Sequence, residues 1–160
     1  MVRVRRMTAK DLGAVTGIHR SILREAVRDV GDAELERGFA HLLEGHPEGC
    51  LVAVDGRRVV GFIVGSVKPW GFGLGVSGWV EVVGVHPDRM GQGVGRALGL
   101  ALLEHFASAG VEEVHTAVRW DSGDIIAFFK SIGFDKSDFI HLRSSRGGGR
   151  RGGRKGGRGR

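Results

Sequence analysis

The sequence predicts a mixed α/β domain, because apolar residues follow strand spacing in some segments and helix spacing in others. The expected order of elements is β-α-α-β-β-β-α-β-α-β, with one or two strands at the end. An Asp-Gly pair marks a hairpin, and a glycine-rich turn later leads into a helix. The 160 residues suffice for one such domain, with a core large enough to be stable without disulfides or a structural metal.

The first third of the chain is expected to form a strand and two helices. Apolar and basic residues alternate over 2–7, which predicts a strand. Thr8 and Asp11 have the spacing of a helix start, and helical spacing follows them. A second amphipathic helix is expected from Gly31-Asp32 to near Gly45.

The rest of the domain alternates strands and helices. Strands over 51–54 and 59–64 meet at Asp55-Gly56, a strong hairpin signal, and four glycines and a proline make 68–78 a loop. The remaining elements are expected as strands over 79–85 and 111–118, helices over 93–109 and 124–132, and one or two strands within 134–142. Residues 144–160 have no apolar side chain, so we expect a folded domain over 1–142 and a disordered tail over 143–160.

Positive charge is concentrated in this tail. The chain has 24 basic and 18 acidic residues, a net charge of +6. Eight of the basic residues and none of the acidic ones fall in 143–160, which leaves 1–142 with a net charge of −2. The Arg/Gly pattern of 146–160 resembles RGG-type RNA-binding segments, and a solubilising appendage is the alternative.

Composition excludes several protein classes. No apolar run approaches the about 20 residues of a membrane helix, and no apolar stretch follows the charged N-terminus, so a signal peptide is not expected. Cys50 is the only cysteine, which excludes a disulfide framework and a cysteine zinc site within the chain. We expect a cytoplasmic protein, no metal, and a half-buried Cys50 side chain.

The stretch from Trp79 to Leu98 carries the chemistry. A strand runs into a turn with Gly91, Gly93 and Gly95, and the turn opens a helix. Glycines let a ligand approach the backbone, and the first helical amides lie unpartnered at the positive end of the helix dipole, where a pyrophosphate is the natural occupant. The stretch lacks the Gly-Lys-Ser/Thr of a P-loop and comes too late for a Rossmann fingerprint; a helix start that is merely glycine-rich is the alternative.

Two landmarks together resemble the GNAT superfamily of acetyl-CoA-dependent N-acetyltransferases. One is the coenzyme A signature, here Met90-Gly91-Gln92-Gly93-Val94-Gly95, and the other is the helix end from Phe128-Phe129 to Gly133-Phe134. The opening over 8–12 and the element order agree, so the resemblance covers residues 1 to about 142. It implies a mixed, mostly antiparallel central sheet with helices on both faces.

The resemblance also implies direct attack of a neutral amine on acetyl-CoA, with no acyl-enzyme. The coenzyme is expected in a cleft between the strands over 79–85 and 111–118, with its pantetheine on the backbone of Val83, Gly84 and Val85. Its pyrophosphate is expected on the backbone amides of Gly91, Gln92, Gly93, Val94, Gly95 and Arg96.

Three positions depart from the superfamily's pattern. Met90 stands where Arg or Gln is usual, with Arg89 one residue early, so coenzyme binding is expected to weaken at most. Ser122 stands where an asparagine is usual, and Phe129 where a tyrosine often protonates the leaving thiolate. Both are still expected beside the coenzyme, and the chain contains no tyrosine to replace the missing one.

Glu81 is the candidate general base. It is the one acid in an apolar strand, and alternation predicts that it shares a face with Val83 and Val85. Several GNAT enzymes carry a carboxylate at this position, and an amine must lose a proton before it attacks. A hydrogen bond to a neighbouring loop is the alternative role.

Other side chains near the expected cleft have structural as well as functional interpretations. His86 is expected in a surface turn, and His115 is a substrate or acid candidate if it faces the cleft. Arg119 and Trp120 end the strand near the cleft mouth. Three aromatic residues are expected either to line an acceptor pocket or to pack over the glycine-rich loop: Trp70, Phe72 and Trp79.

We therefore expect a cytoplasmic N-acetyltransferase that acts on a primary amine. A protein or peptide acceptor is the first choice and a small-molecule amine the second, and with a protein acceptor the tail would hold the enzyme near ribosomes or RNA-bound proteins. The alternative from another class is a GNAT-fold module that binds acetyl-CoA or RNA with little or no turnover. The missing tyrosine favours this alternative, and the retained Glu81 opposes it.

Overall fold

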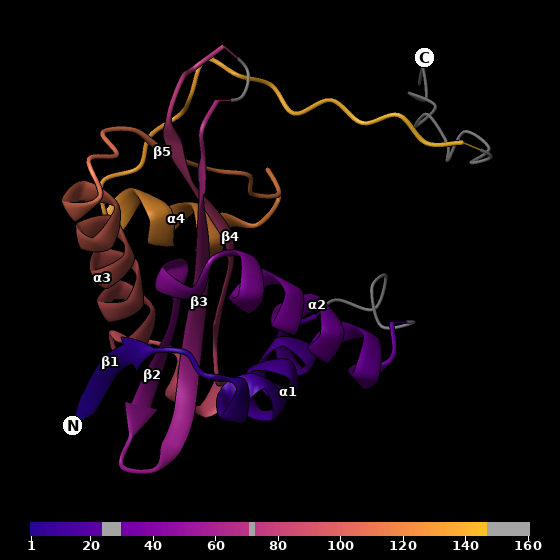
Figure 1. Ribbon diagram of the computed structural model, residues 1–160, viewed down its shortest axis with the longest axis vertical. Coiled ribbons are helices and arrows are strands. Elements are labelled where there is room, and N and C mark those ends of the chain that lie inside the picture. The colour runs from indigo at the N-terminus through magenta and orange to yellow at the C-terminus, as the bar shows by residue number, and fades with distance from the viewer. Residues whose placement is uncertain (24–29, 71–72, 147–160) are drawn as a thin grey trace, which may run out of the picture.

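A five-stranded sheet forms the centre of the computed structural model of the chain, which describes residues 1–23, 30–70 and 73–146. The strands lie in sequence order: β1 (Val2–Arg6), β2 (Cys50–Asp55), β3 (Arg58–Lys68), β4 (Ser77–Val85) and β5 (Val114–Thr116). Neighbours from β1 to β4 pair antiparallel, and β5 pairs with β4 in parallel (Figure 1). The predicted mixed, mostly antiparallel sheet is confirmed.

Helices cover both faces of this sheet, as predicted (Figure 1). α1 (Leu12–Ile22) and α2 (Asp32–Gly45) lie on one face, and α3 (Val94–Ser108) and α4 (Gly123–Ser131) on the other. Each face has its own apolar core, because successive side chains of a strand point to opposite sides. The first core includes Val15, Phe39, Phe62 and Val64, and the second includes Ile63, Val80, Leu98, Phe106 and Phe129.

A hydrogen-bonded turn fixes where the first helix begins. The Asp11 carboxylate accepts from the Thr8 backbone N–H at 2.8 Å, as expected for the predicted helix start. Two guanidinium nitrogens of Arg5, in β1, donate to the same carboxylate at 2.8 and 2.9 Å. These bonds hold the pKa of Asp11 below its usual range, so a charged pair joins β1 to α1.

Two predictions about strands are wrong. β5 is shorter than the predicted 111–118, and no strand forms within 134–142, all of which the structure describes. At the end of β5 the Thr116 hydroxyl donates to the Val80 carbonyl at 3.0 Å, and the pairing with β4 stops there. Beyond α4, Ile140 and Leu142 are 84% and 87% exposed, so their apolar character does not reflect a buried strand.

Two smaller corrections concern the loop and the cysteine. Lys68 belongs to β3 and Ser77 to β4, so the loop predicted over 68–78 is shorter than expected. Cys50 is fully buried instead of half-buried, and burial raises the pKa of its thiol to about 11. This thiol is therefore protonated near neutral pH and a poor nucleophile.

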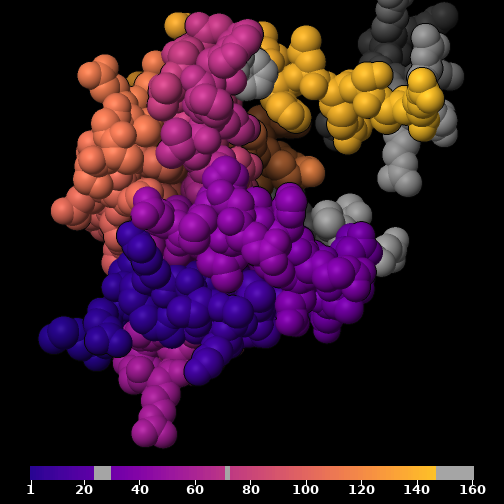
Figure 2. Space-filling view, viewed as in Figure 1, coloured from indigo at the N-terminus to yellow at the C-terminus, as the bar shows by residue number. Residues whose placement is uncertain are grey.

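The ends of β3 and β4 that meet this loop project beyond α1 and α2. Figure 1 shows the two strands rising past the helices, and Figure 2 shows the same end of the molecule standing above the surface that the helices form. Side chains on this part of the sheet therefore lie beyond the helices that cover the rest of that face.

Candidate active site

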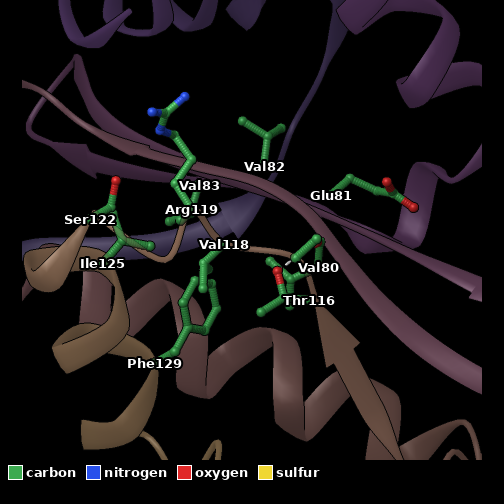
Figure 3. Close-up of a pocket in the computed structure, with 11 residues that line it drawn as sticks. Val80, Glu81, Val82, Val83, Thr116, Val118, Arg119, Ser122, Ile125 and Phe129 are labelled. Atoms are coloured by element: carbon green, nitrogen blue, oxygen red, sulfur yellow. Dashed lines mark hydrogen bonds between the residues drawn. The ribbon is translucent and has the colours of Figure 1, made fainter. Parts of the chain in front are cut away.

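The parallel strands β4 and β5 separate part-way along their length. Their pairing runs from Gly78 and Val114 to Val80 and Thr116, although β4 continues to Val85. A cleft of about 230 Å³ opens where they part (Figure 3). Its walls come from β4, the end of β5 with the chain that follows it, and α4: Val80, Glu81, Val82, Val83, Thr116, Ala117, Val118, Arg119, Ser122, Ile125 and Phe129.

The segment 86–96, here called the glycine turn, connects β4 to α3 and includes the first three residues of α3. Gly91 and Gly93 have φ angles of +74° and +82°, a backbone conformation that residues other than glycine rarely adopt. A Cβ at either position would meet nothing within 4 Å, so backbone conformation and not space requires glycine there. The Ala97 N–H donates to the Gly93 carbonyl at 3.0 Å, so the amides of 94–96 precede the helical hydrogen bonds and face out of the helix end.

The remaining residues of this turn attach it to the domain. A Cβ on Gly95 would lie 3.2 Å from the Phe128 ring, so this glycine serves the packing of α3 on α4. Val94 is buried, the Arg96 guanidinium donates to the Ser131 carbonyl at 2.8 Å, and the Gln92 amide donates to the Asp88 carbonyl at 3.3 Å.

What these residues offer a ligand is consequently their backbone amides, at the positive end of the α3 dipole. Arg89 does not add a cation to the site, because its guanidinium lies 2.7 Å from the Asp55 carboxylate in the β2–β3 hairpin. His86 has the structural role expected of it: its Nδ1 accepts from the Asp88 N–H at 3.3 Å, and its Nε2 lies 3.0 Å from the Arg58 guanidinium.

Three β4 residues were expected to hold a pantetheine arm. Val83 lines the cleft, whereas Gly84 faces α1, where a Cβ would lie 2.5 Å from Phe62 and 3.0 Å from Ile22. Val85 packs near Gly95 on the α3 side. Because β5 pairs with β4 only as far as Val80, the edge of β4 beyond that point borders the cleft instead of another strand.

Phe129 and Ser122 both line the cleft, as expected for residues beside a coenzyme. Phe129 is 5% exposed, and its ring centroid lies 5.0 Å from those of Phe128 and Phe134. Ser122 immediately precedes α4. The contact of either residue with a coenzyme stays a prediction.

Glu81 lies in a β-bulge, and the bulge corrects its expected orientation. Val82 pairs with Val64 and Val80 pairs with Gly65, so Glu81 is one extra residue in β4. Its carboxylate accepts from the Ser66 hydroxyl at 2.5 Å, and in Figure 3 it points away from Phe129. The prediction that Glu81 shares a face with Val83 and Val85 is wrong, because an extra residue interrupts the alternation.

Glu81 belongs to a cluster on the face of the sheet opposite α3. We call this set the Glu81 cluster: Ser66, Lys68, Trp79, Glu81 and His115. A Cβ on Gly65 would contact Phe106 of α3, so Ser66 and Lys68 face the other way. Lys68 Nζ lies 3.9 Å from the Glu81 carboxylate and 4.3 Å from the centroid of the Trp79 ring. The rings of Trp79 and His115 stack at 5.0 Å.

Sequence reasoning missed Ser66 and Lys68, because the strand was expected to end at residue 64 and the loop to begin at residue 68, whereas β3 continues to Lys68. Their spacing of two, which places residues on one face of a strand, was the available signal. His115 lies in this cluster, with its Nε2 3.1 Å from the Glu113 carboxylate, and is not among the residues that line the cleft.

The remaining candidates from the sequence are Arg119 and the aromatic residues around the loop and the cleft mouth. Arg119 lines the cleft but donates to the Asp121 carboxylate at 2.9 and 3.0 Å. Trp70 and Trp120 are 74% and 90% exposed, so neither packs over the loop or a pocket wall. Phe72 lies outside the described residues.

Within residues 1–23, 30–70 and 73–146, no helix combines the length and the apolar character that spanning a bilayer requires. Nor does the described part bring together three or more His, Cys, Asp or Glu side chains that could hold a metal ion. The expectation of no metal stays a prediction.

Comparison with known proteins agrees with this geometry. The model of the Acetyltransferase (GNAT) family matches residues 15–134. The mycothiol acetyltransferase of Nocardioides sp. is 37% identical over 102 residues, which are 58% of this chain and 35% of that protein. The chain thus spans about a third of the length of the curated relatives it matches.

Solved structures share the fold. Ard1 from Thermoplasma volcanium superposes with a TM-score of 0.70 at 26% identity, over 85% of this chain and 84% of that one. The aminoglycoside N-acetyltransferase AAC(6')-Iy, solved in complex with CoA, gives a TM-score of 0.76 over 91% of this chain and 95% of that one. Its identity of 15% supports the fold alone.

Proposed function

The chain belongs to the GNAT family of acetyltransferases, and we propose that it moves the acetyl group of acetyl-CoA to a primary amine by direct attack. The family model covers 15–134, which confirms the resemblance and the enzyme class at the level of the family. The positions of the coenzyme and the acceptor on this chain, and the identity of the acceptor, are proposals.

One observation supports the proposal most: the parts that such a transfer needs lie along a single strand. β4 ends at the glycine turn, borders the cleft in its middle, and carries Glu81 at its bulge. A strand rises about 3.3 Å per residue, so Glu81 and the start of the turn are about 16 Å apart. An extended ligand arm along β4 would connect them.

Backbone groups are proposed to hold the coenzyme. The amides of 91–96 receive the pyrophosphate at the start of α3, where the helix dipole favours negative charge. The edge of β4 at Val83, Gly84 and Val85 pairs with the amide groups of the pantetheine, as an added strand would. Phe129 and Ser122 form the facing wall of the cleft.

Glu81 is proposed as the base that takes a proton from the acceptor ammonium, directly or through water. The amine nitrogen then attacks the thioester carbonyl carbon, the C–S bond breaks, and the sulfur leaves as a thiolate. Phe129 cannot donate a proton to it. Free thiols have a pKa of about 8.5, so a thiolate is a tolerable leaving group near neutral pH, and turnover is expected to be slow but real.

Phe129 also favours a second candidate, a GNAT-fold module that binds acetyl-CoA or RNA with little or no turnover. This side chain fills the cleft position at which the superfamily often has a tyrosine, and the chain contains none elsewhere. The enzyme requires both binding of acetyl-CoA and acetyl transfer. The binding module requires only that acetyl-CoA or RNA binds.

The acceptor is proposed as a primary amine, and the choice of a protein or peptide over a small molecule stays a prediction. The relatives differ in their names, which are mycothiol acetyltransferase, aminoglycoside N-acetyltransferase and Ard1. This spread supports no single acceptor. The domain division at 142, the cytoplasmic location and RNA binding by the tail also stay predictions, and residues 147–160 lie outside the described residues.

An acetyl-transfer assay on an amine panel tests the proposal. The panel contains peptides with free N-termini, lysine peptides, aminoglycosides and simple alkyl amines, and a thiol reagent measures released CoA. Cys50 is buried, so the protein's own thiol contributes little signal. Binding of acetyl-CoA without turnover, for wild type and for Phe129→Tyr, would favour the binding module, and absence of acetyl-CoA binding would overturn the enzyme proposal.

A separate comparison addresses the tail. Deletion of residues 146–160 is expected to abolish retention of the protein on single-stranded RNA, because these residues hold seven basic side chains and no acidic one. The affinity for acetyl-CoA should not change. Equal RNA retention by the truncated chain would place RNA binding in the domain instead.

A further inference from the structure

The position of Lys68 within the Glu81 cluster has a consequence for what the enzyme modifies. Its ammonium lies 4.3 Å from the Trp79 ring centroid and 3.9 Å from the Glu81 carboxylate. An aromatic face and a carboxylate together are how proteins recognise a primary ammonium group. Lys68 therefore occupies a site for the same functional group that the proposed acceptor carries.

The same lysine is also able to move. Its side chain is 42% exposed and extends from the last residue of β3, at the end of the sheet that projects beyond α1 and α2. The carboxylate next to it is held by the Ser66 hydroxyl at 2.5 Å, so the base stays in place when the lysine changes position. A flexible amine thus lies beside a fixed carboxylate that borders the cleft.

We propose that Lys68 is a self-acetylation site, at which bound acetyl-CoA modifies the enzyme's own amine when no acceptor is present. This inference rests on the proposed function. Glu81 takes a proton from the Lys68 ammonium, and the neutral amine forms a C–N bond to the thioester carbonyl carbon. The C–S bond breaks, CoA leaves as a thiolate, and the nitrogen releases its second proton to solvent.

The products are an acetamide at Lys68 and free CoA, and no reagent beyond acetyl-CoA is needed. Acetylation removes the positive charge, so the attraction to the Trp79 ring and to the Glu81 carboxylate is lost in one step. The Glu81 carboxylate is then open to the ammonium group of another acceptor.

The other described lysines provide the chemical background. Lys10 lies in the turn before α1, Lys130 at the end of α4, and Lys136 beyond α4. A rate that reflected only the reactivity of exposed amines toward acetyl-CoA would be similar at these lysines and at Lys68. Modification guided by Glu81 should concentrate at Lys68.

The experiment incubates the full chain with acetyl-CoA alone and follows acetylation of each lysine by peptide mass spectrometry. Modification of Lys68 is expected at least about tenfold faster than that of Lys10, at a rate per molecule that does not depend on protein concentration. Glu81→Gln should slow it by about 10², the lower end of a general-base contribution. Lys68→Arg should abolish the fast phase, and the matched change Lys10→Arg should leave it intact.

The outcomes separate this inference from the proposed function. If amines of the panel are acetylated while Lys68 is modified no faster than Lys10, self-acetylation is overturned and the enzyme proposal stands. A rate per molecule that rises with protein concentration would also overturn it, because the reaction would then occur between molecules. If the protein does not bind acetyl-CoA by calorimetry, both proposals fail together.

Discussion

The glycine turn follows the end of β4, whereas the Glu81 cluster lies near the middle of that strand, and the two are built from different parts of the chain. The turn presents backbone amides, set by Gly91 and Gly93 at positive φ and by the start of α3. The cluster presents side chains from β3, β4 and β5, and a single extra residue at the bulge orients it. The turn is proposed to bind the coenzyme through its backbone amides, whereas the function proposed for the cluster depends on its side chains.

This difference indicates which of the two regions tolerates substitution of its side chains. Met90 in place of Arg or Gln leaves the amides of the glycine turn where they are, because the backbone conformation of the glycines fixes them. Glu81 supplies the one carboxylate of the Glu81 cluster, so removing it leaves the cluster without an equivalent group. We therefore expect variants of the two regions to separate binding from turnover.

The largest effect is expected for Glu81→Gln. It should lower kcat by about 10²-fold, because the general base is lost, and leave the affinity for acetyl-CoA nearly unchanged. Steady-state rates at saturating acetyl-CoA measure the first effect, and calorimetry measures the second.

Glu113→Gln is the matched control, because Glu113 is 63% exposed and lies beside His115 at the start of β5. It should leave kcat within a factor of about two, as expected for a surface substitution. Equal losses in the two variants would mean that the general charge of this face matters and that Glu81 has no particular role.

Gly93→Val tests the glycine turn, which follows the end of β4. A branched side chain at φ +82° should distort the turn and weaken acetyl-CoA binding by at least about 1.4 kcal/mol, or tenfold. Gly110→Val is the control, because Gly110 has φ +78° at the far end of α3 and also has open space around it. Both variants should lose stability, and only Gly93→Val should lose affinity by calorimetry.

A smaller effect is expected for Phe129→Tyr, which adds one oxygen inside the cleft. It should raise kcat severalfold, because a hydroxyl would then be available to protonate the leaving thiolate. Phe134→Tyr makes the same change on a ring 5.0 Å away that does not line the cleft, and it should leave kcat unchanged. An identical gain in both variants would rule out proton donation as the cause.

The smallest effect is expected for Arg89→Ala. Loss of the contact with Asp55 should change the free energy of unfolding little, because exposed ion pairs are screened by solvent. The affinity for acetyl-CoA should not change. A tenfold loss of affinity would mean that Arg89 leaves Asp55 to bind phosphate, and that the glycine turn relies on a side chain after all.

Much of the fold was predictable, because local patterns decide it. The Asp55-Gly56 hairpin, the helix start at Thr8 and the glycine turn are each marked by residues with special backbone chemistry. The strand predicted within 134–142 did not form, because Ile140 and Leu142 find no buried surface, and such partners cannot be read from a local run.

The site was predictable in part for the same reason. The backbone positions around Gly91 and Gly93 follow from the spacing, and the cleft lies where the two parallel strands were expected to part. The orientation of Glu81 was not predictable, since a bulge depends on how Val64 and Gly65 pair with β4 and leaves no mark in an apolar strand. The proximity of Ser66 and Lys68 to Glu81 was not predictable for the same reason.

A crystal structure of the chain with CoA tests most directly whether β4 connects a backbone site for the coenzyme to the Glu81 cluster. The pyrophosphate oxygens should lie within hydrogen-bond distance of the amide nitrogens of 94–96, with the pantetheine along β4 from Val85 to Val83. The sulfur should end near the bulge at Glu81. A coenzyme bound instead between α1 and α2, or held at its pyrophosphate only by the Arg96 and Arg119 side chains, would contradict this assignment.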